Sequence, residues 1–251
     1  MKEFVLITGA TNGIGYEIAK IFAANKANLI LVGRNQAKLE GVKKKLSKNS
    51  EIYTLCADLS KEESAKWIYE ETCKLQGEVS IVINNAGAGY VGEFVEATDE
   101  KIMQLMTLNM TTLTLLTKYY AKDMMANRKG KILNVASTGA YHPGPYTALY
   151  YATKAYVFSL TQALTEELRP YGVVVCSLCP GATATGFAKA AGRENTNIAM
   201  PAHVVAKKAY QDLMKNKRLS IPGIQNKLFV KIPRFIAIKL IKNYQRALKN
   251  K

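Results

Sequence analysis

The chain has 251 residues, of which 48% are hydrophobic, so we expect one large α/β domain with a sizeable core rather than two small domains. Its formal net charge is +16, from 35 Lys and Arg and 19 Asp and Glu residues. The stretch from Leu213 to the C-terminus holds eleven basic residues and no acidic one. The rest of the chain is only mildly basic, which argues against nucleic-acid binding by the whole domain.

The N-terminal sequence MKEFVLITGA has a four-residue apolar run before Thr8, which is too short for a secretory signal. No stretch reaches the roughly 18 apolar residues needed to span a bilayer, so we expect a cytoplasmic protein. Cys176 and Cys179 form C-x-x-C inside the run VVVCSLC. That run is typical of a buried strand, where residues three apart point to opposite faces, and we expect no metal or redox site there.

Short apolar runs alternate with longer amphipathic stretches along the chain. They are, in order, FVLIT, a helix over 14–24, LILVG, a helix over 36–46, IYTLCADL, a helix over 62–75, SIVINNAG, KILNVAS and VVVCSLCPG. Strands alternating with helices of this length predict parallel βαβ units. We therefore predict an α/β fold with a doubly wound parallel sheet of Rossmann type, flanked by helices on both faces. Such sheets bind ligands beyond the carboxyl ends of their strands.

The first predicted strand is followed by TGATNGIG, with glycines at 9, 13 and 15. A glycine-rich turn between a strand and a helix lets the backbone approach a phosphate, and the helix adds free N–H groups and its positive dipole end. The spacing is G-x-x-x-G-x-G, which differs from the usual dinucleotide fingerprint G-x-G-x-x-G. Taken alone, the pattern is also compatible with a tight turn that needs positive φ.

Further motifs follow the later strands: NNAG at 84–87, Asn109, Ser137, Y-x-x-x-K at 150–154, and Pro-Gly at 180–181. With the glycine turn, the sequence resembles the single-domain branch of the short-chain dehydrogenase/reductase family over about 8–185. The resemblance implies a nicotinamide cofactor and a catalytic set of Asn109, Ser137, Tyr150 and Lys154. The cofactor contacts expected are Gly9, Thr11, Asn12, Gly13, Ile14, Gly15, Arg34, Asn35, Lys38, Asp58, Leu59, Asn85, Ala86, Gly87, Tyr150, Lys154, Pro180, Gly181, Thr183 and Thr185.

The end of the second strand predicts the type of cofactor. An acidic residue there would bind the adenosine ribose hydroxyls of NAD, whereas an arginine suits the 2′-phosphate of NADP. Gly33 stands where the acid would be and Arg34 follows it, with Lys38 as a second cation. We therefore expect NADP(H) rather than NAD(H), although Arg34 is also compatible with an ordinary surface charge at a helix start.

The segment ALYYATKAY raises the question of which tyrosine Lys154 serves. A phenol moves protons at neutral pH only if a nearby positive charge lowers its pKa. Tyr150 lies four residues and Tyr151 three residues before Lys154, so spacing alone allows both. The resemblance favours Tyr150, because the family has a thirteen-residue step from Ser137 to its tyrosine. It also implies that Ser137 holds the substrate oxygen, that Lys154 binds the nicotinamide ribose, and that Asn109 keeps a water in a proton relay.

The last third of the chain is less informative. We expect a catalytic domain over 1–225 with a mobile substrate lid at about 186–200, and a basic amphipathic extension over 226–251. In a predicted helix from about Pro233, one face carries Lys239, Lys242, Arg246 and Lys249, and the other Leu240, Ile241, Tyr244 and Leu248. It either packs on protein, which we favour, or contacts an anionic membrane. His142 either lines the pocket or is a surface residue.

We predict an NADP(H)-dependent oxidoreductase of carbonyl reductase or alcohol dehydrogenase type. It would transfer a hydride between the nicotinamide and a ketone or secondary alcohol, with Tyr150 as general acid and base. The alternative is a non-catalytic NADP-binding protein with a regulatory or membrane-associated role. The length of the chain argues against the sugar-nucleotide branch of the family, which needs a larger C-terminal substrate region. The resemblance implies a homodimer or homotetramer, and we expect no bound metal and no nucleic-acid partner.

Overall fold

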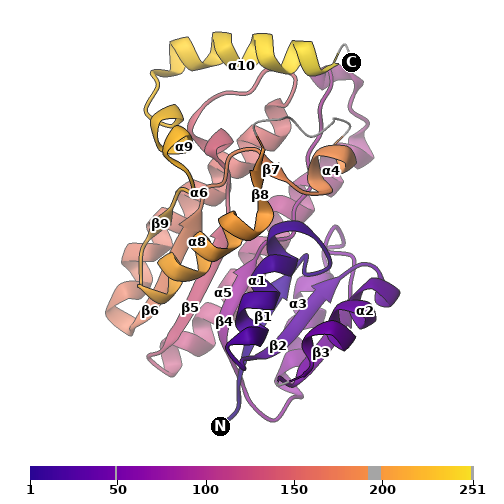
Figure 1. Ribbon diagram of the computed structural model, residues 1–251, viewed down its shortest axis with the longest axis vertical. Coiled ribbons are helices and arrows are strands. Elements are labelled where there is room, and N and C mark those ends of the chain that lie inside the picture. Colours follow the sequence, from indigo (N-terminus) through magenta and orange to yellow (C-terminus); the bar gives the residue numbers. More distant parts are fainter. Residues whose placement is uncertain (49, 192–198, 250–251) are drawn as a thin grey trace.

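The computed structural model of the protein describes residues 1–48, 50–191 and 199–249. Its central layer is a sheet of seven parallel strands in the order β3-β2-β1-β4-β5-β6-β9 (Figure 1). The strands are β1 (Glu3–Thr8), β2 (Asn28–Gly33), β3 (Ile52–Cys56), β4 (Glu78–Asn84), β5 (Gly130–Val135), β6 (Val173–Leu178) and β9 (Leu219–Ser220). The predicted doubly wound sheet is therefore confirmed, and β9 is a strand that the sequence pattern did not indicate.

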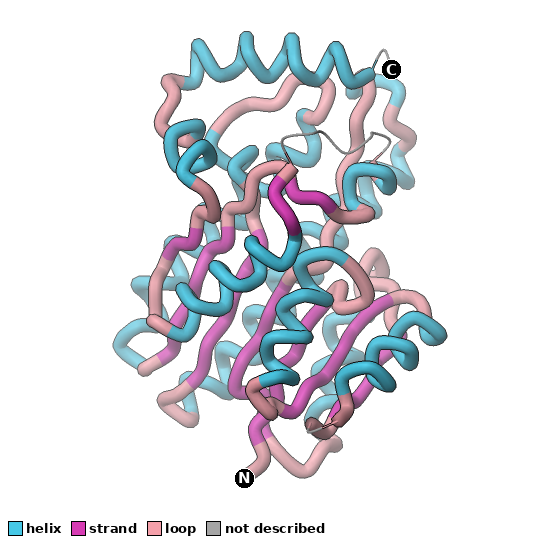
Figure 2. The backbone as a smooth tube through the Cα atoms, viewed as in Figure 1, coloured by secondary structure: helices cyan, strands magenta, loops and turns pink. Residues whose placement is uncertain are grey.

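Helices cover both faces of this sheet. One face packs against α1 (Gly13–Ala24), α2 (Gln36–Leu46) and α8 (Ala202–Met214), and the other against α3 (Ser64–Cys73), α5 (Thr112–Ala126) and α6 (Ala148–Leu168). Each of these helices has an apolar stripe, such as Ile18 and Phe22 of α1, and burying that stripe against the sheet holds the layers together. Figure 2 shows the strands as one twisted layer between the helices.

The chain reverses its direction of travel across the sheet between β1 and β4. From β1 it proceeds to β2 and β3 on one side, and β4, β5 and β6 follow on the other. The carboxyl ends of β1 and β4 thus flank the crevice at which doubly wound sheets bind their ligands. Both the glycine turn after β1 and the NNAG motif at the end of β4 lie at this point.

Shorter elements gather at the carboxyl end of the sheet. They are α4 (Asp99–Met106), a π-helical turn (Thr107–Thr111), 3-10 helices at Phe94–Glu96 and Thr138–Tyr141, α7 (Phe187–Ala190), the β7 (Thr183–Ala184) and β8 (Met200–Pro201) pair, and α9 (Ile224–Phe229). A further 3-10 helix, Arg169–Tyr171, precedes β6 at the amino end of the sheet. Much of the expected lid, residues 192–198, lies outside the described residues. The boundary expected at 225 falls inside α9.

The C-terminal helix α10 (Arg234–Lys249) forms where the sequence predicts it, and it lies across the carboxyl end of the sheet, opposite the N-terminus (Figure 1). It buries Ala237, Ile241 and Gln245 against the rest of the protein. Leu240 and Tyr244, which were expected on the apolar face with Ile241, remain exposed. None of the helices in the described part of the chain combines the length and apolar character required to cross a bilayer.

Candidate active site

The glycine turn between β1 and α1 is shaped by close backbone contacts. Gly13 has a φ of +57°, in the left-handed region that glycine adopts without strain. A Cβ atom at Gly15 would lie 2.4 Å from Asn85 Nδ2 and 2.5 Å from the carbonyl oxygen of Gly9. No side chain fits there, so the turn and the following helix pack closely on the end of β4.

Thr8 and Asn85 join the glycine turn to the NNAG motif. The Thr8 hydroxyl accepts hydrogen bonds from the backbone N–H groups of Asn85 and Ala86, both at 3.0 Å. In return, Asn85 Nδ2 donates to the carbonyl oxygens of Thr8 at 2.9 Å and Gly9 at 3.3 Å. These bonds fix the carboxyl ends of the two neighbouring strands relative to each other, and with them the floor of the crevice.

The N-terminus of α1 is suited to an anion. Asn12 caps the helix, its Oδ1 accepting a hydrogen bond of 2.7 Å from the N–H of Gly13, and the positive end of the helix dipole lies at this turn. The loop after β6 reaches the same turn: a Cβ atom at Gly13 would lie 2.8 Å from Thr185 Cγ2, and one at Gly186 2.6 Å from Asn12 Nδ2. The expected contacts Gly13 and Thr185 are therefore neighbours in space. The glycines leave the turn without side chains at 9, 13 and 15, which suits the close approach of a pyrophosphate to the backbone.

The end of β2 leaves little clearance for a side chain at position 33. A Cβ atom at Gly33 would lie 3.2 Å from Thr11 Cγ2 and 3.4 Å from Leu39 Cδ2. Arg34, the next residue, is exposed. Asn35 caps α2, with its Oδ1 accepting a hydrogen bond of 2.9 Å from the N–H of Lys38. Position 33 thus carries no acid, while the neighbouring guanidinium is exposed to solvent.

Asp58 follows β3 on the same side of the crevice. Its Oδ1 accepts hydrogen bonds from Ser60, at 2.7 Å from the hydroxyl and 3.1 Å from the N–H. These bonds, and then the positive charges of Arg34 and Lys61, lower the pKa of the Asp58 carboxyl. Leu59 is buried, and its carbonyl oxygen accepts a hydrogen bond of 2.8 Å from Thr112. The carboxylate, the arginine and an apolar side chain therefore border one end of the crevice.

Lys154 is the buried cation of the site. Its Nζ donates a hydrogen bond of 2.7 Å to the carbonyl oxygen of Val135 and lies 5.9 Å from the centroid of the Tyr150 ring. The side chain is almost fully buried, and this burial lowers the pKa of Lys154 to about 8. The ammonium group therefore loses its proton more readily than an exposed lysine would, so its charge depends on the groups around it.

Asn109 is fully buried in the π-helical turn between α4 and α5. Its Nδ2 donates to the carbonyl oxygen of Ala88 at 2.9 Å and to the Thr153 hydroxyl at 3.0 Å, and its Oδ1 accepts from the N–H of Ala88 at 3.0 Å. A Cβ atom at Gly87 would lie 3.2 Å from Asn109 Oδ1 and 3.4 Å from Lys154 Nζ. Both groups therefore border the same point at the end of β4. Wide helical turns of this kind are frequent at functional sites.

Ser137 and Tyr150 come from the end of β5 and the start of α6. Ser137 begins the 3-10 helix Thr138–Tyr141, which packs on α6, and its Oγ accepts a hydrogen bond of 3.0 Å from the N–H of Gly139. The Tyr150 ring lies 5.4 Å from the Phe187 ring, between centroids. Tyr151 instead packs on two glycines, since a Cβ atom at Gly144 would lie 2.4 Å from its ring. The two neighbouring tyrosines thus have different surroundings.

The loop after β6 is held from two sides. The carbonyl oxygen of Pro180 accepts a hydrogen bond of 2.9 Å from the N–H of Thr138, which links this loop to the one that carries Ser137. On the other side, a Cβ atom at Gly181 would lie 2.2 Å from Asn226 Oδ1 of α9. The Thr183 hydroxyl donates to the carbonyl oxygen of Gly181 at 3.0 Å. Asn226 of α9 therefore packs directly against the loop after β6.

His142 is buried and joins the loop that follows Ser137 to α9. Its Nε2 lies 3.1 Å from the carbonyl oxygen of Phe229, so the ring donates this hydrogen bond, and the two rings meet edge to face with centroids 5.0 Å apart. The surface interpretation of His142 is therefore wrong. The roles of Thr8, Thr153 and Asn226 were also missed. The first two stand beside motif residues in the sequence, whereas no local signal marks Asn226.

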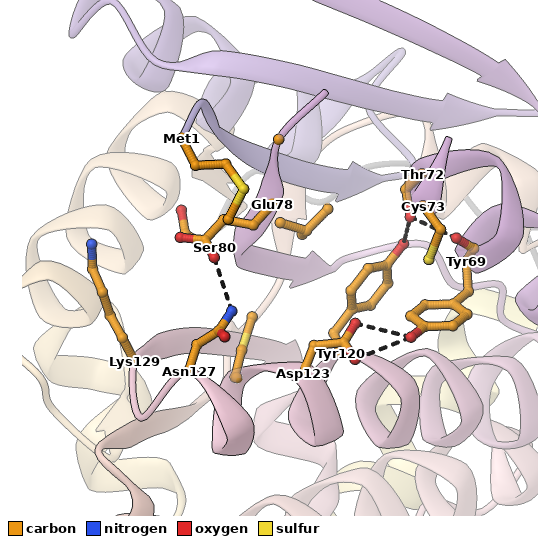
Figure 3. Close-up of a pocket in the computed structure, with 13 residues that line it drawn as sticks. Met1, Tyr69, Thr72, Cys73, Glu78, Ser80, Tyr120, Asp123, Asn127 and Lys129 are labelled. Carbon is orange, nitrogen blue, oxygen red and sulfur yellow. Dashed lines mark hydrogen bonds between the residues drawn. The ribbon is translucent and has the colours of Figure 1, made fainter. Parts of the chain in front are cut away.

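A separate cavity of about 250 Å³ lies at the opposite, amino edge of the sheet, where Met1 and the first residue of β4, Glu78, contribute to its lining (Figure 3). Its polar groups bond to one another: the Tyr69 hydroxyl donates to the Asp123 carboxylate at 3.0 Å, and Thr72 and Tyr120 share a hydrogen bond of 2.8 Å. None of the motif residues lines it.

Cys176 and Cys179 are both buried, and the described residues contain no group of three or more His, Cys, Asp or Glu placed to hold a metal.

Comparison with known proteins agrees with this geometry. The model of the short chain dehydrogenase family matches residues 3–196. The chain belongs to this family. It is 30% identical to the very-long-chain 3-oxoacyl-CoA reductase of Rattus norvegicus over an alignment 262 positions long. The alignment covers all of this chain and 82% of the relative. The protein is therefore an oxidoreductase of the short-chain dehydrogenase/reductase family, whose chemistry is hydride transfer with a nicotinamide cofactor.

Two solved structures of family members share the fold and differ in cofactor. A short-chain dehydrogenase from Sphingobium yanoikuyae in complex with NADPH is 29% identical, covers 99% of this chain and 95% of its own, and superposes with a TM-score of 0.84. A family member from Burkholderia phymatum in complex with NAD superposes with a TM-score of 0.85, over 95% of each chain, at 22% identity. The second likeness concerns the fold alone.

Proposed function

We propose that this oxidoreductase uses NADP(H) and interconverts a ketone and a secondary alcohol, with Tyr150 as the general acid and base. The observation that carries the proposal is the buried Lys154 ammonium, 5.9 Å from the Tyr150 ring and anchored on Val135. A positive charge beside a phenol favours its ionised form, which is what a tyrosine needs to exchange protons near neutral pH. The alternative, a protein that binds NADP without catalysis, would use Lys154 only to bind the nicotinamide ribose and gives the neighbouring phenol no role.

The residues divide the chemical work among them. The bound nicotinamide cofactor supplies the hydride to the carbonyl carbon, or accepts it in the opposite direction. During reduction, Ser137 holds the carbonyl oxygen and Tyr150 donates a proton to it, leaving a phenolate that the Lys154 charge stabilises. Asn109 anchors the chain around Ala88 and Gly87, next to Lys154. We propose that proton exchange with solvent passes through this region and restores the tyrosine.

Two observations support NADP(H) over NAD(H). Gly33 offers no carboxylate to recognise the ribose hydroxyls of NAD, and the exposed Arg34 is suited to a 2′-phosphate. The NADPH complex of the Sphingobium relative agrees with this choice. Lys38, also exposed and one turn into α2, would add a second positive charge.

Apolar rings on one side of the proposed acid favour an apolar substrate. Phe187 lies beside Tyr150, and Phe229 lies on His142 in the adjoining loop. A hydrophobic carbonyl compound would bury surface against such rings, with about 25 cal/mol gained per Å² of apolar area removed from water. The rat relative is named for a very-long-chain acyl substrate, which agrees with an apolar carbonyl compound as the substrate here.

The outer helices offer surfaces for partners. We propose a homodimer or homotetramer through the outer faces of α5 and α6, where the hydroxyls of Thr114 and Tyr156 share a hydrogen bond of 3.0 Å and Tyr156 is exposed. We also propose peripheral contact of α10 with a membrane surface, by an otherwise cytoplasmic protein.

Replacing Tyr150 with phenylalanine tests the catalytic assignment. We expect Tyr150→Phe to lower NADPH oxidation with a panel of ketones by about 10²- to 10⁴-fold, the usual contribution of a positioned acid, while NADPH binding stays nearly unchanged. Tyr151→Phe, at the neighbouring residue, is the matched control and should keep most of the activity. Turnover in Tyr150→Phe equal to that of the unaltered protein would refute the assignment.

A further inference from the structure

Large apolar side chains are exposed on the two C-terminal helices. Ile224 and Leu228 of α9 are 75% and 64% exposed, and Phe235 and Leu240 of α10 are 70% and 53% exposed. Single exposed apolar residues are common on any protein, but a group on two consecutive helices marks a surface that contacts something else. We call this surface the C-terminal apolar surface. Its members are Ile224, Leu228, Phe235, Ile236, Ile238, Leu240 and Tyr244.

Helix α10 contacts the rest of the protein through one narrow stripe. Ala237, Ile241 and Gln245 are spaced four residues apart and are all buried. A second row with the same spacing, Ile236, Leu240 and Tyr244, lies beside this stripe and remains exposed. The helix is therefore held in place and still presents apolar side chains outward. Packing on the body explains only part of its apolar character.

The opposite flank of α10 carries basic residues, with Phe235 and Ile238 of the C-terminal apolar surface among them. Lys239, Lys242 and Arg246 are exposed, and Lys231 and Arg234 precede them at the start of the helix. The sequence contains no acidic residue after Asp212, so no carboxylate within this segment offsets the charge. A helix with an apolar row and a basic flank suits an anionic lipid surface, where it lies in the interface with apolar residues toward the acyl chains and lysines at the phosphates.

We infer that α9 and α10 dock on the surface of a bilayer containing anionic phospholipid, through the C-terminal apolar surface and Lys239, Lys242 and Arg246. This deepens the peripheral contact included in the proposed function and names its face and its lipid class. Because α10 lies across the carboxyl end of the sheet, docking turns the end of the protein that holds the active site toward the lipid (Figure 1). An apolar carbonyl substrate dissolved in the membrane would then be close to the site.

Vesicle flotation of the full chain tests the inference. We expect binding to vesicles that mix phosphatidylglycerol with phosphatidylcholine, and weak binding to pure phosphatidylcholine or in about 0.5 M NaCl, because salt screens the charges. The triple variant Lys239→Gln, Lys242→Gln, Arg246→Gln should bind the anionic vesicles about a hundredfold less tightly. The double variant Ile236→Ser, Leu240→Ser should lose about tenfold, through reduced apolar burial.

Matched controls separate this surface from general effects of charge and polarity. The triple variant Lys44→Gln, Lys45→Gln, Lys48→Gln removes three exposed cations around the end of α2, and Val204→Ser removes an exposed apolar side chain of α8. Both should bind vesicles as the unaltered protein does. Equal binding to neutral and anionic vesicles, or equal losses in the α2 and α10 triple variants, would overturn the inference.

Light scattering and turnover distinguish the remaining outcomes. If Ile236→Ser, Leu240→Ser halves the molecular mass and no variant affects vesicle binding, the surface is an interface between copies of the chain and the inference fails. NADPH oxidation with a water-soluble ketone, measured without vesicles, should be unchanged in the α10 variants. Vesicle binding without any such oxidation would refute the proposed reaction and leave the docking surface in place.

Discussion

The cofactor turn and the C-terminal wall of the active site are built in different ways. The turn is fixed by residues of two sequence motifs: Thr8, Gly9 and Asn85 bond to one another at the ends of two adjacent strands, although 77 residues separate Thr8 from Asn85. The wall depends on α9, which carries no motif, since His142 bonds to Phe229 and Asn226 packs on Gly181. Both regions are held by contacts between distant parts of the chain, but motifs mark both sides of the contact only in the turn.

The largest expected effect concerns Lys154, the buried cation of the site. Its pKa is about 8 in the folded protein, below the value near 10.4 of an unfolded chain, so the unfolded state binds more protons between these pH values. Below about pH 8 the buried charge of Lys154 therefore reduces the free energy of unfolding by its full amount. This reduction disappears as the pH rises from about 8 to about 10.4. Between about pH 10.4 and pH 7, Lys154→Met should gain about 3 kcal/mol of stability relative to the unaltered protein, from a starting value lowered by the lost hydrogen bond to the Val135 carbonyl.

Urea unfolding at several pH values checks this linkage. The stability of Lys154→Met relative to the unaltered protein should fall steadily between about pH 8 and pH 10.4. Lys66→Met, at an exposed lysine of α3, is the control and should show no such trend. A constant difference between Lys154→Met and the unaltered protein across this range would contradict the assigned burial of the charge.

The next effect breaks the cofactor turn itself. Gly15→Ala would place a methyl group 2.4 Å from Asn85 Nδ2 and 2.5 Å from the backbone oxygen of Gly9, and the backbone cannot yield without moving the turn. Overpacking of this kind costs about 1–3 kcal/mol, and we expect NADPH binding to weaken by about tenfold or more. Gly41→Ala is the matched control, since a Cβ atom there meets nothing within 4 Å.

Fluorescence titration with NADPH and thermal unfolding measure both glycine variants. Gly41→Ala should bind NADPH normally and be slightly more stable, because alanine favours a helix over glycine. Normal NADPH affinity in Gly15→Ala would show that the turn tolerates more movement than its contacts indicate, and would weaken the contrast with the wall.

A smaller effect sharpens the cofactor choice. Arg34→Ala should lower the preference for NADPH over NADH by about tenfold, as expected for the loss of one charged hydrogen-bonding partner of a phosphate. Lys38→Ala should act in the same direction and less strongly, since an ammonium lacks the paired donors of a guanidinium. The measurement is the ratio of kcat/KM with the two cofactors. An unchanged ratio in Arg34→Ala would leave the arginine as an ordinary surface charge.

The smallest effect tests the wall. His142→Ala removes the hydrogen bond to Phe229 and the ring contact between α9 and the loop that follows Ser137. We expect the free energy of unfolding to fall by about 1 kcal/mol for the hydrogen bond. We expect KM for bulky apolar ketones to rise severalfold, with little change for small ketones or in NADPH affinity. His203→Ala, at the exposed second histidine of the chain, is the control. Equal changes for small and bulky ketones would argue against a role of the wall in substrate selection.

Much of the fold could be predicted because its signals are local. The alternation of apolar runs with amphipathic stretches gave six of the seven strands of the main sheet and their order along the chain. The short strand β9 was missed, since two residues carry no periodic pattern. The capping role of Asn35 was also missed, although an asparagine before a helix is a common cap. Asn226 could not be found, because no motif marks it and its contact with Gly181 exists only in the folded chain.

The sequence by itself determined the sheet, the glycine turn and the order of the motif residues, because strand periodicity and the conformational needs of glycine depend on a few neighbouring residues. Only the tertiary structure decided the surroundings of the two tyrosines that both lie within reach of Lys154 on a helix. The ring of Tyr151 packs on Gly139 and Gly144, while that of Tyr150 lies beside Lys154 and Phe187. Packing also decided that α10 buries one narrow stripe and leaves its second apolar row exposed, since burial depends on what the rest of the chain places against a helix.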